Sequence, residues 1–372
     1  MKYYIIAGEA SGDLHASNLM KAIRLRDPQA EFRAWGGDRM LNEGAVIVKH
    51  INELAFMGFV EVVLNLRTII KNLKFCKEDI LEYKPDVVIF IDYPGFNLRI
   101  AEFAKKNHFK TVYYISPQVW AWKKSRVKKI RRDIDKMLVI LPFEEAFYNE
   151  YDYPVTFVGH PLLDALEQKD TEISDTDFIV ENKLTDKPII ALLPGSRKQE
   201  ISRMLELMCK TSDSFPDYQF VIAGVSAHST DFYKKYSGNR DIPIIFGHTY
   251  QLLRIAHAAL VTSGTATLET ALIGTPQVVC YKAGTLSYYI ARKLVDVKYI
   301  SLVNLIMDEQ VVRELIQNDC NSVNMKSELE KIAEKGIYRE NILNKYKELR
   351  IKLGGSGASE KAAKEIVEFL EN

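Results

Sequence analysis

One carboxylate stands where an α/β protein usually places its chemistry. Val87–Ile91 is an apolar, mostly β-branched run, which predicts a strand buried on both faces, as in a parallel sheet. Asp92 follows directly, and Tyr93-Pro94-Gly95 then breaks the chain. We therefore expect Asp92 at the carboxyl edge of the sheet, where open α/β folds bind ligands. Its carboxylate could act as a general base or cap the next helix, and spacing alone leaves both open.

A glycine-containing turn follows the first strand of the chain. Tyr3–Ala7 predicts that strand, and Gly8-Glu9-Ala10-Ser11-Gly12-Asp13 leads into a helix. The glycines let the backbone approach a ligand closely, and the first amides of the helix favour an anion. The three-glycine fingerprint is incomplete, so dinucleotide binding is not favoured. A tight connection capped by Ser11 or Asp13 is the alternative.

A comparable turn opens the second half of the chain. Pro188–Leu193 predicts a strand that ends in Pro194-Gly195-Ser196-Arg197, before a helix from about Lys198. Ser196 can cap this helix, and Arg197 can bind a phosphate in a forked geometry at the helix N-terminus. An arginine in a first helical turn opposes the helix dipole, and a bound anion would remove that conflict.

A second anion-binding turn is predicted after Ala259–Ser263. The chain passes through Gly264-Thr265-Ala266-Thr267 into a helix that carries Glu269. Backbone amides in such a turn form a nest for an anion. Glu269 could hydrogen-bond hydroxyl groups of a ligand or simply complement the helix dipole.

The elements that must position these residues form two series of alternating strands and helices. Residues 1–165 hold seven strand-like runs separated by helix-length intervals, and a new βα series begins at Pro188. The predicted fold class is α/β, with two doubly wound, Rossmann-like domains at residues 1–165 and 186–345. The last segment, residues 346–372, should end in a helix that packs back toward the first domain.

Composition restricts the function classes further. The 372 residues carry a net charge of +1, which argues against a dedicated nucleic-acid binder. The chain begins a strand almost at once and has no apolar run of membrane-spanning length, which predicts a cytoplasmic protein. The Asp133/Asp135 and Asp175/Asp177 pairs do not follow strands, so we interpret them as surface residues rather than metal ligands. The cysteines have no paired spacing and are expected to be reduced: Cys76, Cys209, Cys280 and Cys320.

A basic, amphipathic segment suggests peripheral membrane contact. Residues 56–75 predict a helix with a broad apolar face, flanked by Arg67, Lys71 and Lys74. Residues 123–132 contain seven basic residues in ten, and Trp120 and Trp122 precede them. Core packing and a solvated helix face are the ordinary interpretations; acyl chains and anionic headgroups are the alternative. The candidate lipid-facing positions are Val63, Leu66, Ile69, Ile70 and Leu73.

Taken together, the motifs resemble those of the lipid-A-disaccharide synthase family, in the same order and over nearly the whole chain. Ser301-Leu302-Val303-Asn304 departs slightly, because that family commonly has proline at the position of Val303. The motifs are Gly8-Glu9-Ala10-Ser11-Gly12-Asp13, Met57-Gly58-Phe59-Val60-Glu61-Val62, Asp92-Tyr93-Pro94-Gly95-Phe96-Asn97, Ser116-Pro117-Gln118-Val119-Trp120-Ala121-Trp122, Gly159-His160-Pro161-Leu162, Leu193-Pro194-Gly195-Ser196-Arg197 and Ser263-Gly264-Thr265-Ala266-Thr267-Leu268-Glu269.

The resemblance implies the glycosyltransferase B (GT-B) architecture, with both domains facing a cleft, and an inverting transfer that needs no metal or other cofactor. UDP-2,3-diacylglucosamine would react with 2,3-diacylglucosamine 1-phosphate (lipid X), giving the β-1′,6-linked lipid A disaccharide 1-phosphate and UDP at the inner-membrane phospholipid surface. Asp92 would be the general base and Arg197 would stabilise the leaving diphosphate. A homodimer is left open. The implied substrate contacts are Glu9, Ser11 and Asp13 on the acceptor side, and Ser196, Gly264, Thr265, Ala266, Thr267, Glu269 and Asn304 on the nucleotide-sugar side, with Glu269 on the ribose.

Three other functions fit parts of the pattern. A UDP-N-acetylglucosamine 2-epimerase shares the architecture but needs no apolar acceptor surface. A membrane-associated nucleotide-sugar-binding protein would bind UDP without turnover and would leave Asp92 without a role. A lipid-carrier-dependent muropeptide transferase would require different acceptor motifs.

Overall fold

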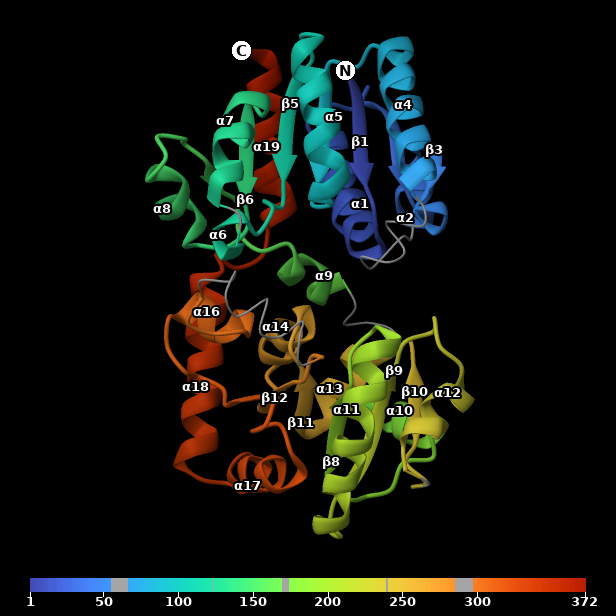
Figure 1. Ribbon diagram of the computed structural model, residues 1–372, viewed down its shortest axis with the longest axis vertical. Coiled ribbons are helices and arrows are strands. Elements are labelled where there is room, and N and C mark those ends of the chain that lie inside the picture. The colour runs from blue at the N-terminus through green and yellow to red at the C-terminus, as the bar shows by residue number, and fades with distance from the viewer. Residues whose placement is uncertain (55–65, 123, 169–173, 239, 285–296) are drawn as a thin grey trace. The chain divides into compact units, whose positions relative to one another are not determined.

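The protein is described by a computed structural model covering residues 1–54, 66–122, 124–168, 174–238, 240–284 and 297–372. The chain divides into two compact units, the first made of residues 1–168 and 353–372 and the second of residues 169–352 (Figure 1). Each unit contains one parallel sheet, so the prediction of two doubly wound α/β halves is confirmed. Val63 and Lys123 lie outside the described residues.

In the described residues of the first unit, seven parallel strands lie in the order β3-β2-β1-β4-β5-β6-β7. Strand order runs one way from β1 and the other way from β4, and these two strands pair with Ala7 opposite Ile91. The direction therefore reverses between β1 and β4, and in open α/β sheets such a reversal point is where ligands bind. The elements are β1 (Lys2–Ala7), α1 (Ala10–Arg24), β2 (Glu31–Gly36), α2 (Asp38–Asn42), β3 (Val46–His50), η1 (Ile51–Glu53), α4 (Leu66–Tyr83), β4 (Val87–Ile91), α5 (Pro94–Lys106), β5 (Lys110–Tyr114), α6 (Val119–Trp122), η2 (Lys124–Arg126), α7 (Val127–Asp133), β6 (Lys136–Val139), α8 (Glu144–Asn149), β7 (Thr156–Phe157), α9 (Leu162–Gln168) and α19 (Ala358–Glu371).

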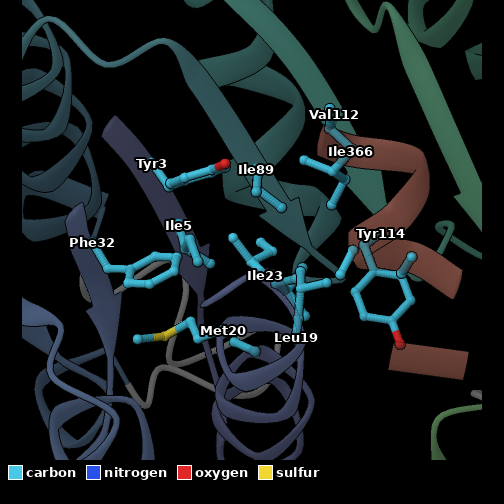
Figure 2. Packing of buried hydrophobic residues seen from close by; sticks show 14 of the residues in the cluster. Tyr3, Ile5, Leu19, Met20, Ile23, Phe32, Ile89, Val112, Tyr114 and Ile366 are labelled. Carbon is cyan, nitrogen blue, oxygen red and sulfur yellow. The ribbon is translucent and has the colours of Figure 1, made fainter. Parts of the chain in front are cut away.

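Two apolar layers hold the first sheet between its helices. Alternate residues of β1 point to opposite faces: Tyr3 and Ile5 pack with α1 and α19, and Tyr4 and Ile6 pack with α4, α5 and α7. Figure 2 shows the first of these layers, in which Ile366 of α19 joins the core. Burial on both faces explains the continuous apolar runs by which these strands were predicted.

The second unit repeats this plan: the part of it that the structure describes has six parallel strands in the order β10-β9-β8-β11-β12-β13. Here the direction reverses between β8 and β11, which pair with Leu193 opposite Val261. The elements are α10 (Asp175–Glu181), β8 (Ile189–Leu193), α11 (Lys198–Thr211), η3 (Ser212–Ser214), β9 (Gln219–Gly224), α12 (Thr230–Tyr236), β10 (Ile244–Phe246), α13 (Thr249–Ile255), β11 (Ala256–Thr262), α14 (Thr265–Ile273), β12 (Gln277–Tyr281), α16 (Leu302–Met307), β13 (Glu314–Ile316), α17 (Ser322–Ala333) and α18 (Ile337–Lys352).

The C-terminal helix α19 belongs to the first unit. Asp164 of α9 accepts hydrogen bonds from the amides of Gly357 and Ser359 at 2.7 and 2.8 Å, which caps α19. Glu365 pairs with Lys136 at 2.6 Å and ties the helix to β6. Along the chain, the boundary between the second unit and this last segment lies between residues 352 and 353. The expected boundary, between residues 345 and 346, falls inside the continuous helix α18.

The predicted amphipathic segment is described only from α4 onward. Ile70 is 58% exposed and Ile69 is half-buried, whereas Leu73 packs against the core beneath the helix. The lipid-facing interpretation is therefore not supported for Leu73 and stays a prediction for Ile69 and Ile70. Among the helices that the structure describes, none is long and apolar enough to cross a bilayer.

Three other side-chain predictions can be compared with their surroundings. All four cysteines are free and buried, as expected. Trp120 is buried with its ring edge-on to Phe143 at 5.0 Å, so it is a core residue. Asp133 is not at the surface: it is 3% exposed and binds the guanidinium of Arg132, because the last turn of α7 carries it inward.

Candidate functional site

Asp92 lies where the strand order of the first unit reverses. It follows β4 directly, and the backbone turns sharply there, with φ of 42° at Asp92 and 49° at Tyr93. Both values lie in the left-handed region that side chains with a Cβ usually avoid. Tyr93, not Asp92, is the N-cap of α5, and the Tyr93 side chain makes no capping hydrogen bond. The helix-cap interpretation of Asp92 is therefore wrong.

The backbone carbonyl of Asp92 is held by two buried side chains. Asn97 of α5 donates from Nδ2 at 2.7 Å, and the hydroxyl of Tyr113 on β5 donates to the same oxygen. Asn97 Nδ2 also lies 3.3 Å from the carbonyl of Ile91 and 3.4 Å from that of Ile6. These bonds fasten the ends of both reversal-point strands to the turn that carries Asp92.

The carboxyl group of Asp92 is set up to exchange a proton near neutral pH. Burial is the larger cause and the nearby carboxylate of Glu9 the smaller one, and together they raise the pKa of Asp92 to about 6. Glu9 is half-buried and accepts a hydrogen bond from Ser11 Oγ at 2.8 Å. The structure thus brings Glu9, Ser11 and Asp92 together at one sheet edge.

Gly8 allows this close approach. A Cβ on Gly8 would lie 2.3 Å from Cγ of Tyr93, so the tyrosine ring lies directly over the backbone of the first turn. A larger residue at position 8 would push the ring and the left-handed turn aside. The glycine was predicted to admit a ligand, and here it admits the ring of Tyr93.

The carboxylate of Asp13 binds backbone amides of the protein itself. Its oxygens accept from the amides of Gly37, Arg39 and Met40 at 2.7, 3.1 and 3.2 Å, and the residue is 4% exposed. Asp13 therefore caps α2 from α1. The prediction that Asp13 contacts the acceptor is not supported, because its acceptor capacity is used by the backbone.

At the reversal point of the second unit, Arg197 follows the turn after β8. Its side chain is 68% exposed, and Nη1 lies 3.6 Å from Glu200 Oε1. The other Glu200 oxygen accepts from the amides of Ser196 and Arg197 at 3.1 and 3.2 Å. The turn amides that we predicted for a phosphate therefore have an internal carboxylate partner. Sequence reasoning missed Glu200, although an acidic residue three positions after an N-cap is a known capping signal.

The neighbouring turn after β11 leaves its backbone toward solvent. Gly264 and Thr265 are exposed, and α14 begins at Thr265, so its first amides have no preceding helical carbonyl to bond. Thr267 is buried and its hydroxyl donates to the carbonyl of Gly264 at 2.8 Å. Glu269 is half-buried and accepts from the hydroxyl of Tyr250 on α13 at 2.7 Å.

Asn304 is fully committed inside the second unit. It is 0% exposed; Oδ1 accepts from the amides of Val311 and Val312, and Nδ2 donates to the carbonyl of Val312 and to Glu314. The prediction that Asn304 contacts the nucleotide or donor sugar is not supported by this geometry. Glu314 also accepts from the amides of Ile300 and Ser301, so this pair fixes the start of α16.

In the part of the chain that the structure describes, no group of three or more His, Cys, Asp or Glu side chains is placed to hold a metal ion. The groups placed at the two reversal points include the carboxylates of Glu9 and Asp92 in the first unit, and the guanidinium of Arg197 and backbone amides in the second. These groups can accept a proton from a hydroxyl, hold hydroxyl groups and neutralise an anionic leaving group.

Comparison with known proteins gives the same family throughout the chain. A family model described as lipid-A-disaccharide synthetase matches residues 3–367. The chain is 41% identical to a lipid-A-disaccharide synthase of Syntrophus aciditrophicus, covering 96% of this chain and 95% of that one. It is 38% identical to the enzyme of that name from Trichlorobacter lovleyi, covering 99% and 97%.

Solved structures resemble the chain in fold. One is a UDP-GlcNAc 2-epimerase from Neisseria meningitidis bound to UDP-GlcNAc, with a TM-score of 0.69 at 15% identity and full coverage of both chains. Another is the glycotransferase of kitacinnamycin, with a TM-score of 0.66 at 14% identity and 99% coverage of each chain. At these identities the likeness supports the GT-B-like fold alone.

Proposed function

The chain belongs to the lipid-A-disaccharide synthetase family, and on that premise we propose which of its residues carry the transfer. It is a glycosyltransferase of lipid A biosynthesis that condenses UDP-2,3-diacylglucosamine with 2,3-diacylglucosamine 1-phosphate and releases UDP. The epimerase alternative is set aside, because epimerases match the chain only in fold whereas synthases match it in sequence.

Asp92 is the general base of the proposed mechanism. Its carboxylate takes the proton of the acceptor 6-hydroxyl while that oxygen attacks the anomeric carbon of the donor. The bond from this carbon to the UDP oxygen breaks, and UDP leaves from the opposite face, so one displacement inverts the configuration. The observation that carries this role is the half-buried carboxyl of Asp92 at the strand reversal point, which does not cap α5 and whose pKa is raised to about 6.

The leaving diphosphate is stabilised by groups of the second unit. Arg197 offers an exposed guanidinium, which binds phosphate oxygens in a forked geometry. The first amides of α14, from Thr265 and Ala266, add hydrogen-bond donors at a positive helix end. Because a diphosphate leaves as a stable anion, charge stabilisation matters more than protonation. Glu269 accepts hydrogen bonds from the ribose hydroxyls, either in place of the hydrogen bond from Tyr250 or in addition to it.

We also propose that the protein contacts the inner membrane peripherally from its cytoplasmic side. Both substrates carry acyl chains, and α4 presents exposed Ile70 among exposed Arg67, Lys71 and Lys74. Apolar insertion combined with attraction of lysine and arginine to anionic headgroups is the usual mode of interfacial binding. The second basic run contributes less, since Lys129 and Arg132 already lie 2.6 and 3.6 Å from Glu102.

The test of Asp92 is the Asp92→Asn variant, with Asp86→Asn as its matched control. Asp86 precedes the same strand at the opposite edge of the sheet, where it accepts from the amide of Lys2 at 2.7 Å. We expect Asp92→Asn to lower kcat by about 10²–10⁴-fold with unchanged UDP binding, as for loss of a general base. Near-normal turnover of Asp92→Asn would remove this residue from the mechanism.

A further inference from the structure

The backbone that carries Asp92 does not adopt its conformation unaided. Asp92 and Tyr93 are two successive left-handed residues, neither of them glycine. Such a pair persists only where surrounding contacts impose it, and strained backbone of this kind gathers at functional sites. A relaxed turn would direct the Asp92 side chain elsewhere, so whatever holds the turn also determines where the carboxyl group lies.

Two side chains from different elements hold it. The Tyr113 hydroxyl, from β5, and the Asn97 amide, from α5, converge on the carbonyl oxygen of Asp92. Both residues are 0% exposed, so both are shielded from solvent. Tyr113 pairs in the sheet with Phe90, which is two residues before Asp92. This register brings the tyrosine hydroxyl within reach of the turn. The contact is thus built by sheet register and helix packing together.

We propose that Tyr113 and Asn97 are positioning residues of the glycosyl transfer, which hold the left-handed turn at Asp92 and Tyr93 so that the Asp92 carboxyl stays beside Glu9 at the strand reversal point. This inference rests on the proposed role of Asp92 as general base. The Tyr113 hydroxyl and the Asn97 amide thus contribute to catalysis through the Asp92 turn, without contacting the substrate.

The variant that tests it is Tyr113→Phe, which removes one oxygen and keeps the ring in the core. Tyr114→Phe is the matched control: Tyr114 is the next residue of β5, equally buried, and its ring packs on the opposite sheet face with α1 and α19 (Figure 2). We expect Tyr113→Phe to lower kcat about 10- to 100-fold, as for a small misplacement of a reacting group, with the donor KM within about twofold. Tyr114→Phe should keep wild-type kcat.

A double variant separates positioning from general loosening. If the hydroxyl acts only through Asp92, then Tyr113→Phe costs nothing further in an Asp92→Asn background, because coupled residues are not additive. Asn97→Ser, measured in the same way, provides an independent variant should Tyr113→Phe fail to fold. UDP binding to the second unit serves as the fold control for each variant.

The outcomes are distinguishable. Tyr113→Phe or Asn97→Ser with kcat within about fivefold of wild type, an equal loss in Tyr114→Phe, or an additive loss in the double variant would overturn the positioning role. Normal turnover of Asp92→Asn alone would instead refute the proposed base. A selective, non-additive loss of kcat supports both.

Discussion

The pH dependence of the transfer should report the raised pKa of Asp92. Because the base must be ionised, kcat/KM follows the fraction of ionised Asp92 in the free enzyme. With a pKa of about 6, that fraction rises from about a tenth at pH 5 to about nine-tenths at pH 7. An aspartate at the ordinary value of 3.8 would be almost fully ionised across this range. We therefore expect kcat/KM to increase about tenfold between these pH values.

Glu9→Gln separates the two causes of the shift. The substitution keeps the length of the side chain and an oxygen for the hydrogen bond from Ser11, and it removes the negative charge beside Asp92. The pKa of Asp92 should fall because the negative charge of a neighbouring carboxylate no longer opposes ionisation of Asp92. Burial remains and is the larger cause, so the inflection should move to lower pH without reaching the value of an exposed aspartate.

The assay is kcat/KM for disaccharide formation in mixed micelles, at constant ionic strength and subsaturating acceptor, across pH 4.5–8. Each preparation is checked for refolding by returning it to pH 7 before measurement. A profile that is flat between pH 5 and 7, or an inflection that Glu9→Gln leaves in place, would refute the reasoning about Asp92 and its neighbour.

Three other predictions follow from the same geometry. Asp92→Asn should stabilise the protein at pH 7 by about 3 kcal/mol. Between pH 3.8 and about 6 the folded state holds a proton that the unfolded chain has released, so the wild type loses stability as the pH rises through this range, and by pH 7 the loss is complete; a lower Tm than wild type at pH 7 would contradict this. Glu200→Gln should tighten UDP binding, measured by calorimetry, about two- to fivefold. The substitution removes a negative charge that competes with the diphosphate for Arg197 and the turn amides; weaker binding would show that Glu200 does not compete with the diphosphate. Ile70→Ser should reduce sedimentation with anionic phospholipid vesicles at unchanged Tm, whereas Leu73→Ser should lower Tm because Leu73 packs on the core; equal vesicle binding by Ile70→Ser would place this face of α4 outside the lipid contact.

The sequence predicted features that depend on local pattern. The strands that end at Ala7, Ile91 and Leu193 could be located because a strand buried on both faces needs an unbroken apolar run. The residue after each run marks its end: a glycine, a carboxylate and a proline, respectively. The meeting of Glu9 and Asp92 at one edge follows from parallel pairing once β1 and β4 are neighbours.

Features that depend on distant partners could not be predicted. Asp13 and Asn304 have the residue types of ligand-binding side chains, and only the folded chain shows that backbone amides of α2 and of residues 311–312 use their oxygens. Tyr113 reads as an ordinary strand residue, since its role depends on the register between β4 and β5. The start of β11 at Ala256 was also missed, because Ala256 and His257 continue the helical pattern of α13.

We propose that this chain transfers a sugar with side chains and backbone amides alone. The most direct test incubates the purified protein in detergent with UDP-2,3-diacylglucosamine and 2,3-diacylglucosamine 1-phosphate in excess EDTA, and follows both products by mass spectrometry. We expect disaccharide 1-phosphate and UDP in equal amounts, at a rate that EDTA does not change. UDP without disaccharide, or a rate abolished by EDTA and restored by a divalent cation, would contradict the account.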